Sequence, residues 1–246
     1  MSGGVAVPIQ QDLRKVVASL RAHGPRVALG LITKNILHKA RWYLDRGFDR
    51  KYGTTTSLVI ALASLDISSE NVQHGVYYEP TPTRVFRHLM RSLAIAHERF
   101  TFCDLGSGLG RTLLLASDYP FRAIVGVEFS ETLHRIAEEN IRIYRSSRQK
   151  CFAIRSTCMD AAEWPIPDEP TVFFLYNPFL PPVMTRVLTN IKESLDRAPR
   201  EVVIVYYNPL SAHVIEGFGF LPHKQELSLP HDFTRQIQRR VTVFRN

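Results

Sequence analysis

The hydrophobic positions from Phe100 to the end of the chain follow one rhythm. Short, nearly continuous apolar runs alternate with amphipathic stretches, which is typical of parallel strands buried on both faces by helices. Two final runs have no amphipathic stretch between them and predict an antiparallel hairpin at the sheet edge. The runs are "FTFCDL", "RAIVGVE", "KCFAIRSTC", "TVFFLY" and "EVVIVYY", followed by "GFGFLPHKQELSL" and "RQIQRRVTVF". The pattern predicts an α/β fold: a doubly wound, mostly parallel seven-stranded sheet with a C-terminal antiparallel hairpin.

The first 70 residues follow a different pattern. Apolar residues recur at helical spacing over 9–22 and 26–44, and Gly24-Pro25 separates the two stretches. Residues 45–57, "DRGFDRKYGTTTS", are rich in Gly, Thr and charge and predict a flexible loop. We therefore expect a basic helical N-terminal extension or lid over 1–70 and a second domain over 71–246, in which a helix begins near Thr83 after Pro80 and Pro82.

Charge is concentrated in the N-terminal segment. The chain carries a net charge of +8, and residues 1–53 hold ten Lys and Arg against three acids, a net of +7. These basic helices have three interpretations: a solvated face of a lid, a surface for nucleic acid or an acidic partner, or a membrane-surface contact. No apolar run approaches the roughly 18–20 residues of a membrane span, so we expect no membrane span and a cytoplasmic protein.

Cysteines indicate no metal or redox chemistry. The three cysteines form no CxxC pair, and no His, Cys and Asp set has metal-ligand spacing, so no metal site is expected. Cys103 and Cys151 lie in apolar runs, which favours buried, reduced thiols.

The stretch "DLGSGLGR", residues 104–111, carries the chemistry. Its glycines at 106, 108 and 110 follow a strand and precede a helix, where a backbone turn can approach a ligand closely. The dinucleotide pattern G-x-G-x-x-G would need glycine at position 111, which is Arg111. The stretch instead matches [DE]-x-G-x-G-x-G and resembles motif I of the class I, seven-strand methyltransferases that depend on S-adenosylmethionine (SAM).

Two acids after the next strands strengthen the resemblance. Glu128 ends the second run, 22 residues after Gly106, and Asp160 follows the third. The resemblance implies that Glu128 binds the ribose hydroxyls and Asp160, beside Ala161, the adenine amino group. Alternatively, Glu128 is a surface acid at the end of a strand, and Asp160 is an aspartate that caps a helix.

The segment "YYEPTPTRVFRHLM" precedes this region and resembles the Y-x-P-T-P segment of methyltransferases related to the non-SET histone-lysine enzyme. The span from residue 49 to residue 179 also resembles uncharacterised bacterial SAM-dependent methyltransferases. The resemblance to the relatives of the non-SET enzyme implies that Tyr78, Thr81 and Pro82 fold over the methionine end of SAM. The complete set of expected cofactor-binding residues is Tyr78, Thr81, Asp104, Gly106, Ser107, Gly108, Gly110, Glu128, Phe129, Asp160, Ala161 and Asn177.

The acceptor side is expected where the fourth and fifth runs end, in "YNPF" and "YYNPL". "YNPF" resembles a shortened [DNS]-P-P-[YFW] motif of amino methyltransferases, with one proline missing. We expect Asn177, Tyr78 and Tyr207 to be catalytic. Asn-Pro used simply as a turn, and tyrosines used simply as core, are the alternatives.

The resulting functional hypothesis is a SAM-dependent methyltransferase that transfers a methyl group by in-line displacement. A nitrogen of a small molecule or a protein side chain is the favoured acceptor, and nucleic acid could be reached through the basic helices. O-methylation and RNA methylation by the same fold are alternatives. A non-catalytic SAM-binding module and an NAD(P)-dependent dehydrogenase are alternatives of other classes, the latter disfavoured by Arg111 and the terminal hairpin. The sequence does not indicate an oligomeric state.

Overall fold

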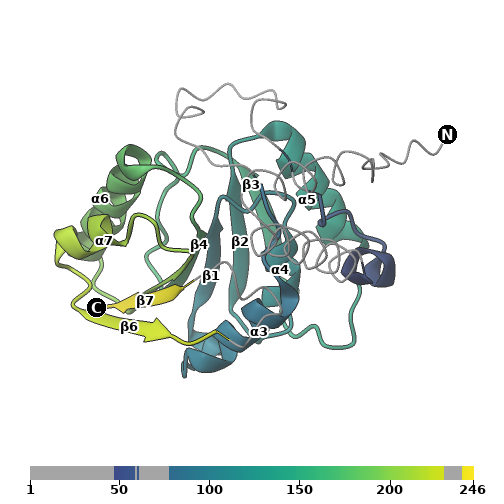
Figure 1. Cartoon of the computed structure of the whole chain (residues 1–246), viewed down its shortest axis with the longest axis horizontal. Helices are drawn as coiled ribbons and strands as arrows, with labels where there is room; N and C mark the ends of the chain where they lie inside the picture. Colours follow the sequence, from purple (N-terminus) through teal and green to yellow (C-terminus); the bar gives the residue numbers. More distant parts are fainter. Residues whose placement is uncertain (1–46, 59, 61–77, 230–239) are drawn as a thin grey trace, which may run out of the picture. The chain divides into compact units, whose positions relative to one another are not determined.

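A single sheet organises the part of the chain that the computed structural model describes, which comprises residues 47–58, 60, 78–229 and 240–246. The sheet has seven strands in the order β3-β2-β1-β4-β5-β7-β6 (Figure 1). β1 to β5 are parallel, whereas β7 is antiparallel to both β5 and β6. The strands are β1 (Thr101–Leu105), β2 (Ala123–Glu128), β3 (Ile154–Cys158), β4 (Thr171–Tyr176), β5 (Val202–Tyr207), β6 (His223–Leu227) and β7 (Val241–Arg245).

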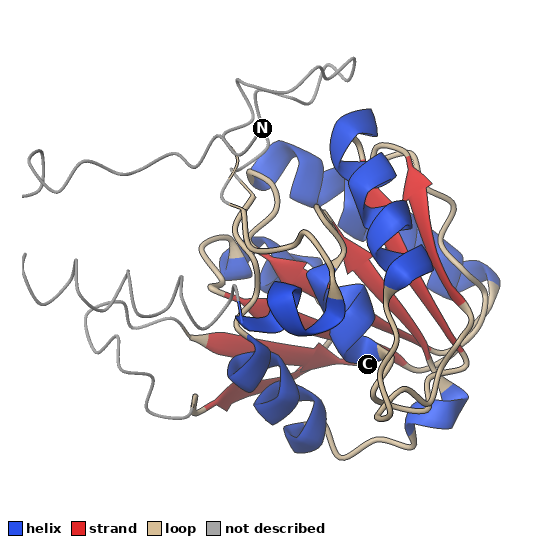
Figure 2. Cartoon of the chain, turned by 90° about the vertical axis from the view of Figure 1, so that its right-hand side faces the viewer, coloured by secondary structure: helices blue, strands red, loops and turns tan. Residues whose placement is uncertain are grey.

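Helices cover both faces of the sheet (Figure 2). Alternate side chains of each strand point to opposite faces, so Phe102 packs in one apolar cluster and Cys103 in the other. The first cluster joins the strands to α3 and α4, with α5 beside them, and the second joins them to α6 and α7. The helices are α3 (Thr83–Ser92), α4 (Arg111–Ala116), α5 (Glu131–Ile143), α6 (Pro181–Arg197) and α7 (Ala212–Phe218), and a short 3-10 helix, η3, spans His97–Arg99.

The predicted fold class is confirmed, including the C-terminal hairpin. β3 is shorter than predicted and begins at Ile154 rather than at residue 150. The reason is local: the backbone N–H groups of Lys150 and Cys151 both donate to the Ser117 carbonyl, at 2.7 and 3.2 Å, and so do not join the ladder. The helix predicted near Thr83 begins there, directly after Pro82, and Cys103 and Cys151 are buried as expected.

The prediction of a loop over residues 45–57 is wrong for residues 47–52, whereas residues 53–57 lie outside helices and strands. Residues 47–52 are helical. Phe48 and Tyr52 are four residues apart and therefore share one helix face, where both rings lie near Tyr144, with centroids 6.1 and 4.8 Å away. This helix and the polar residues that follow it are packed against α4 and α5.

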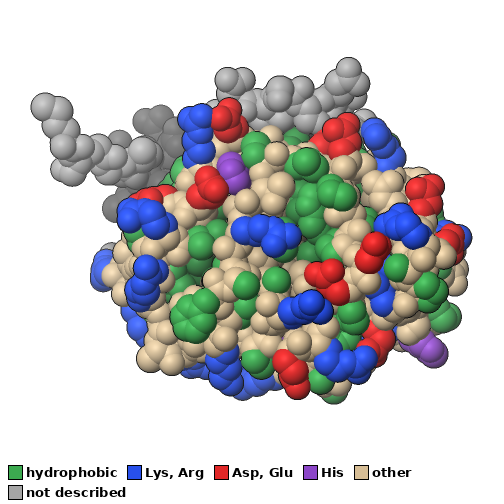
Figure 3. Space-filling view, turned by 180° about the vertical axis from the view of Figure 1, so that it is seen from behind, with side chains coloured by type: hydrophobic (Ala, Val, Ile, Leu, Met, Phe, Trp, Pro, Cys, Tyr) green, Lys and Arg blue, Asp and Glu red, His purple; other side chains and the backbone are tan. Residues whose placement is uncertain are grey.

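Two expectations concern residues outside the described ranges. The basic helices over 9–44 and the domain boundary near residue 70 fall there and stay predictions. Figure 3 shows one face of the described molecule, on which Lys and Arg are interspersed with Asp and Glu. Within the described ranges, no helix combines the length and apolar character needed to cross a bilayer.

Candidate functional site

The glycine turn between β1 and α4 is shaped by positive φ angles. Gly106 and Gly108 have φ of 86° and 52°, in the left-handed region that other residues seldom adopt. Both are also crowded: a Cβ at Gly106 would lie 2.7 Å from the Pro178 Cβ, and one at Gly108 would lie 2.1 Å from the Tyr78 ring. The turn therefore brings bare backbone against the chain that follows β4 and against Tyr78.

A cavity opens beside this turn, at the carboxyl ends of β1, β2 and β4. Its empty volume is about 590 Å³, part of which is open to solvent. This is the edge at which open parallel sheets bind their ligands. Its lining consists of Tyr78, Glu79, Thr81, Asp104, Gly106, Ser107, Gly108, Arg111, Thr112, Glu128, Phe129, Leu133, Phe174, Tyr176 and Pro178.

Glu128 is the buried carboxylate of this cavity, with 3% of its surface exposed. One carboxylate oxygen accepts from the Gly108 N–H at 2.8 Å and the other from the Ser130 N–H at 2.9 Å. Burial raises the pKa of Glu128 to about 7, although the hydrogen bonds from Ser130 and Gly108 favour the ionised form. Glu128 is thus held by the glycine turn and by the N-cap residue of α5.

Asp104, at the end of β1, lies in the same cavity and is equally buried. Its carboxylate accepts a hydrogen bond from the Thr112 hydroxyl. Burial raises the pKa of Asp104 to about 7; the Thr112 bond lowers it, and the charge of Glu128 raises it further. Two neighbouring carboxyl groups, both with raised pKa values, therefore lie in this cavity, where their oxygens can accept hydrogen bonds from a ligand.

A second, more apolar cavity of about 370 Å³ continues past Gly106. At its rim the Asp160 carboxylate accepts from the Ala162 N–H at 2.9 Å. An apolar slot with one acid at its rim is suited to a flat ring that carries an amino group. The lining residues are Gly106, Val127, Phe129, Met159, Asp160, Ala161, Pro178, Phe179 and Val183.

Asn177 begins the turn after β4 and is 8% exposed, with a left-handed φ of 44°. Its Oδ1 accepts a hydrogen bond from the Tyr206 hydroxyl at 3.1 Å, and that hydroxyl accepts from the Ser211 N–H at 3.3 Å. Tyr206 therefore links the Asn-Pro turn after β4 to the one after β5, in which Asn208 has a φ of 55°.

A carboxylate and two tyrosines lie near the expected acceptor side. The Tyr176 hydroxyl donates to Glu79 Oε2 at 3.0 Å, and its ring centroid lies 4.5 Å from that of Tyr207. Glu79 and Tyr176 line the larger cavity, whereas Tyr207 is 2% exposed and packs in the core beneath them. Tyr207 thus supports the cavity wall from behind.

Eight of the expected site residues line the larger cavity: Tyr78, Thr81, Asp104, Gly106, Ser107, Gly108, Glu128 and Phe129. Asp160 and Ala161 line the smaller one, together with Gly106 and Phe129. Gly110, Asn177 and Tyr207 are not among the lining residues of either cavity. The roles of all these residues stay predictions.

Sequence reasoning missed several lining residues. Phe174 and Tyr176 are two apart on β4 and so face the same side, which the period of a strand could have indicated. Thr112 and Leu133 gave no signal of their own, whereas Pro178 belongs to the "YNPF" motif that marked the expected acceptor side. Arg111 was used only to exclude a dinucleotide site, yet it lines the cavity.

Sheet topology and one family model indicate the same class of protein. The order β3-β2-β1-β4-β5-β7-β6, with β7 antiparallel, carries the inserted final strand that distinguishes methyltransferase sheets from dinucleotide-binding sheets. Residues 60–163, less than half of the 246-residue chain, match the family model "Histone methylation protein DOT1". The described chain has the class I methyltransferase fold. The resemblance found in the sequence, to this class and to its non-SET lysine methyltransferase subgroup, is confirmed.

Solved structures of similar fold share little sequence with the chain. A protein of Nostoc punctiforme assigned as an O-methyltransferase has a TM-score of 0.49 and 18% sequence identity to this chain. The match covers 67% of this chain but only 56% of the length of that protein. An RNA methyltransferase from Salinibacter ruber, in complex with S-adenosyl-L-homocysteine (SAH), has a TM-score of 0.41 and 20% identity, with 68% of this chain and 91% of that chain covered.

Magnesium protoporphyrin IX methyltransferase from Synechocystis, with bound SAM, has a TM-score of 0.44 and 15% identity, with 67% of this chain and 79% of that chain covered. Among curated protein sequences, no match was found.

Proposed function

We propose that this protein is a SAM-dependent methyltransferase whose acceptor is a nitrogen of a small molecule or of a protein side chain. The observation that carries the proposal is Glu128, a buried carboxylate at the end of β2 that is held by backbone donors from Gly108 and Ser130. A carboxylate in this position can accept hydrogen bonds from both hydroxyls of a ribose.

The residues present fit SAM in two further respects. The Ser107 hydroxyl is buried and has no hydrogen-bond partner among the described residues, so a bound ligand would complete its environment. The bare backbone at Gly106 and Gly108 also leaves room where any Cβ would collide with the surrounding chain. Asp160 and Ala161 would hold the adenine ring, and Tyr78 and Thr81 the methionine end. When bound, SAM supplies a methyl group that is already activated by its sulfonium centre.

A nitrogen acceptor is supported by the charge and the rings on the acceptor side. An amine gains positive charge as it is methylated, and groups that stabilise this developing charge accelerate the reaction. Glu79 supplies a carboxylate and Tyr78 and Tyr176 supply ring faces, which attract cations. Asn177, whose amide is oriented by the Tyr206 hydroxyl, would position the nucleophile.

Calorimetric titration with SAH and with NAD tests the cofactor. We expect SAH to bind and NAD not to bind, because Arg111 replaces the third glycine of the dinucleotide pattern. Binding of NAD alone would refute the methyltransferase proposal. Glu128→Gln is the matched control, since it should lose SAH affinity without altering the fold.

Incubation with methyl-labelled SAM and fractionated cell extract tests the acceptor. Label should enter the small-molecule or protein pool, and tandem mass spectrometry of the products should place the methyl group on nitrogen rather than on an ether or ester oxygen. Entry into RNA, or release of the label as methanol under mild base, would replace the nitrogen assignment with the corresponding alternative. SAH binding without label transfer to any pool would indicate a non-catalytic SAM-binding module.

A further inference from the structure

A short polar segment before the family-model match lies against the glycine turn. Residues 54–57, Thr-Thr-Thr-Ser, follow the helix over 47–52 and are called the strap below. Three of the four are buried, although none is apolar. The matched span begins at residue 60, so the strap is outside what the family model covers.

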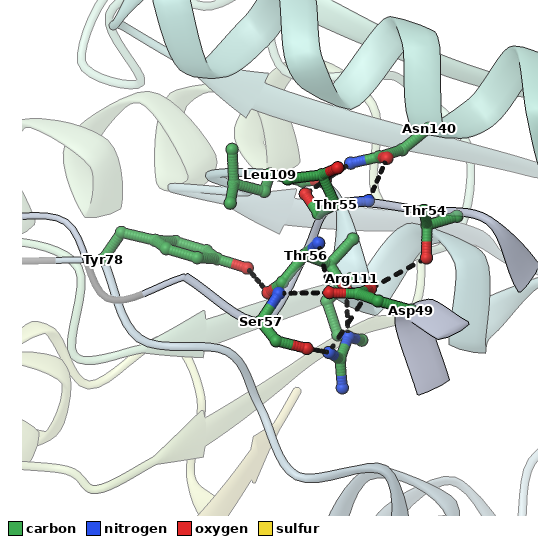
Figure 4. Close-up of polar contacts among 9 residues, drawn as sticks. All are labelled: Asp49, Thr54, Thr55, Thr56, Ser57, Tyr78, Leu109, Arg111 and Asn140. Atoms are coloured by element: carbon green, nitrogen blue, oxygen red, sulfur yellow. Dashed lines mark hydrogen bonds and ion pairs between the residues drawn. The ribbon is translucent and has the colours of Figure 1, made fainter. Parts of the chain in front are cut away.

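Asp49 folds the strap into its shape. Its carboxylate accepts four hydrogen bonds: from the Thr54 hydroxyl at 2.8 Å, the Thr56 N–H at 2.9 Å, the Thr56 hydroxyl at 2.6 Å and the Ser57 N–H at 2.7 Å (Figure 4). Burial alone would raise the pKa of Asp49, but these hydrogen bonds outweigh it and lower the pKa. Asp49 is thus an ionised, polar centre around which the strap turns.

Arg111 attaches the strap to the cofactor turn. Its guanidinium is buried, with 1% of the side chain exposed, and donates to the Thr56 hydroxyl and, at 2.7 Å, to the Ser57 hydroxyl. Its Nη2 lies 3.8 Å from Asp49 Oδ1, and the guanidinium rests on the Phe48 ring, 4.4 Å from its centroid. Since Arg111 is the first residue of α4, the strap is bonded to the end of the glycine turn.

Asn140 joins the same parts from α5. Its Oδ1 accepts from the Thr55 N–H at 2.7 Å, and its Nδ2 donates to the Thr55 carbonyl and to the Leu109 carbonyl, each at 2.9 Å. Leu109 belongs to the glycine turn, and Asn140 is 1% exposed. One buried amide therefore pairs with the strap and with the turn at once (Figure 4).

Tyr78 completes the connection on the other side of the cavity. Its hydroxyl donates to the Thr56 carbonyl at 2.9 Å, while its ring lies against Gly108. The strap is therefore hydrogen-bonded directly to two residues of the cavity lining, Tyr78 and Arg111, and is joined to Leu109 in the turn through Asn140.

We propose that the strap is an integral part of the cofactor site, and that Asp49, Arg111 and Asn140 are positioning residues that set the geometry of the glycine turn and of Tyr78. The inference rests on the proposed function for the identity of the ligand, SAM or SAH. It follows that cofactor binding and ordering of the strap are coupled: each must favour the other by the same factor.

The test measures SAH affinity by calorimetry in the full chain and in three variants. Asp49→Asn removes the charge around which the strap turns, and Asn140→Ala removes the amide that joins the strap to Leu109. Arg111→Lys keeps the charge but loses the planar fork that reaches two hydroxyls. We expect each to weaken SAH binding by at least about tenfold, a loss typical of one hydrogen bond to a charged or buried group. Asp118→Asn is the matched control, because Asp118 is also an aspartate that contacts arginine, here Arg87 and Arg148, and it is absent from the cavity lining.

A purely structural role would lower the melting temperature of the Asp49 and Asp118 variants alike and leave SAH affinity unchanged in both. Amide hydrogen exchange supplies a second readout: SAH should slow exchange at residues 54–57 in the unmodified protein. The inference is overturned if the three variants bind SAH within twofold of the unmodified protein, or if SAH leaves exchange in the strap unaltered. If the unmodified protein does not bind SAH at all, the proposed function fails and the inference fails with it.

Discussion

The turn after β1 and the turns after β4 and β5 share positive φ angles but differ in the residue type that adopts them. All three place left-handed backbone at the carboxyl ends of strands. After β1 the positions are glycines, whereas after β4 and β5 they are Asn177 and Asn208, with φ of 44° and 55°. Glycine and asparagine are the residues that enter this region at least cost, but only asparagine brings a functional side chain.

The neighbours of each turn explain the choice. A Cβ at Gly108 would penetrate the Tyr78 ring, so this turn can offer a ligand only its backbone. Asn177 has room for its amide, which is held by the Tyr206 hydroxyl. In the proposed function, the turn at the cofactor side thus offers backbone and the turn at the acceptor side offers a side chain. Four experiments test this distinction, in order of decreasing expected effect.

Gly108→Ala should have the largest effect. The left-handed backbone costs about 1–2 kcal/mol with a Cβ, and the collision with Tyr78 adds about 1–3 kcal/mol of overpacking strain. We expect no measurable SAH binding by calorimetry. Gly217→Ala, in α7 with nothing within 4 Å of the new methyl group, is the control and should be neutral or slightly stabilising. Normal SAH affinity in Gly108→Ala would mean that the turn does not need bare backbone.

Glu128→Gln should weaken SAH binding by about 10- to 100-fold, the cost of about 1.5–3 kcal/mol for a hydrogen bond to a charged group. The variant keeps the shape of the side chain but turns an amide donor toward the N–H donors of Gly108 or Ser130. Titration calorimetry measures the loss. Glu138→Gln, on the exposed side of α5, serves as the control, and an equal loss there would remove the special role of Glu128.

SAH affinity should rise with pH. Glu128 has a pKa of about 7 because it is buried, and its ionised form is the better acceptor for two hydroxyls. Glu128 is therefore half-protonated near pH 7. Because its ionised form binds SAH better, affinity should increase about tenfold from pH 6 to pH 8.

The same raised pKa predicts the opposite trend for the ligand-free protein. The folded state holds a proton that the unfolded state releases at lower pH, so this group lowers the free energy of unfolding as pH rises toward 7. Calorimetry and thermal unfolding at pH 6, 7 and 8 check the two trends. A Glu128→Gln variant with an unchanged pH profile would assign the effect to Asp104 instead, whose pKa is also raised to about 7.

Asn177→Gly and Asn208→Gly compare the two asparagine turns and should have the smallest effects on binding. Glycine keeps the left-handed backbone in both, so stability and SAH affinity should change little. Only Asn177→Gly removes the amide held by Tyr206, and we expect its methyl-transfer rate to fall about tenfold or more, as for loss of one positioning contact. Transfer of labelled methyl is the measurement. Equal rates in both variants would show that Asn177 is only a turn residue.

The sheet and the position of the glycine turn were predictable because both follow from local pattern. Alternation of apolar runs with amphipathic helices, and turn glycines directly after a strand, are features of neighbouring residues. The helix over 47–52 was not predictable from the same kind of pattern, because its apolar face is only Phe48 and Tyr52 among charged residues. Its stability depends on contacts with Tyr144 and Arg111, which are more than 60 residues away from Tyr52 and Phe48, respectively, along the chain.

By itself, the sequence determined the fold class, the glycine turn and the acids at 104, 128 and 160, because strand period and turn chemistry are local. Only the tertiary structure decided that Asp49, Arg111 and Asn140 meet, and that Tyr207 lies behind the cavity wall while Tyr176 faces the cavity. Long-range contacts of this kind depend on how strands and helices are stacked in space, and no periodicity along the chain records them.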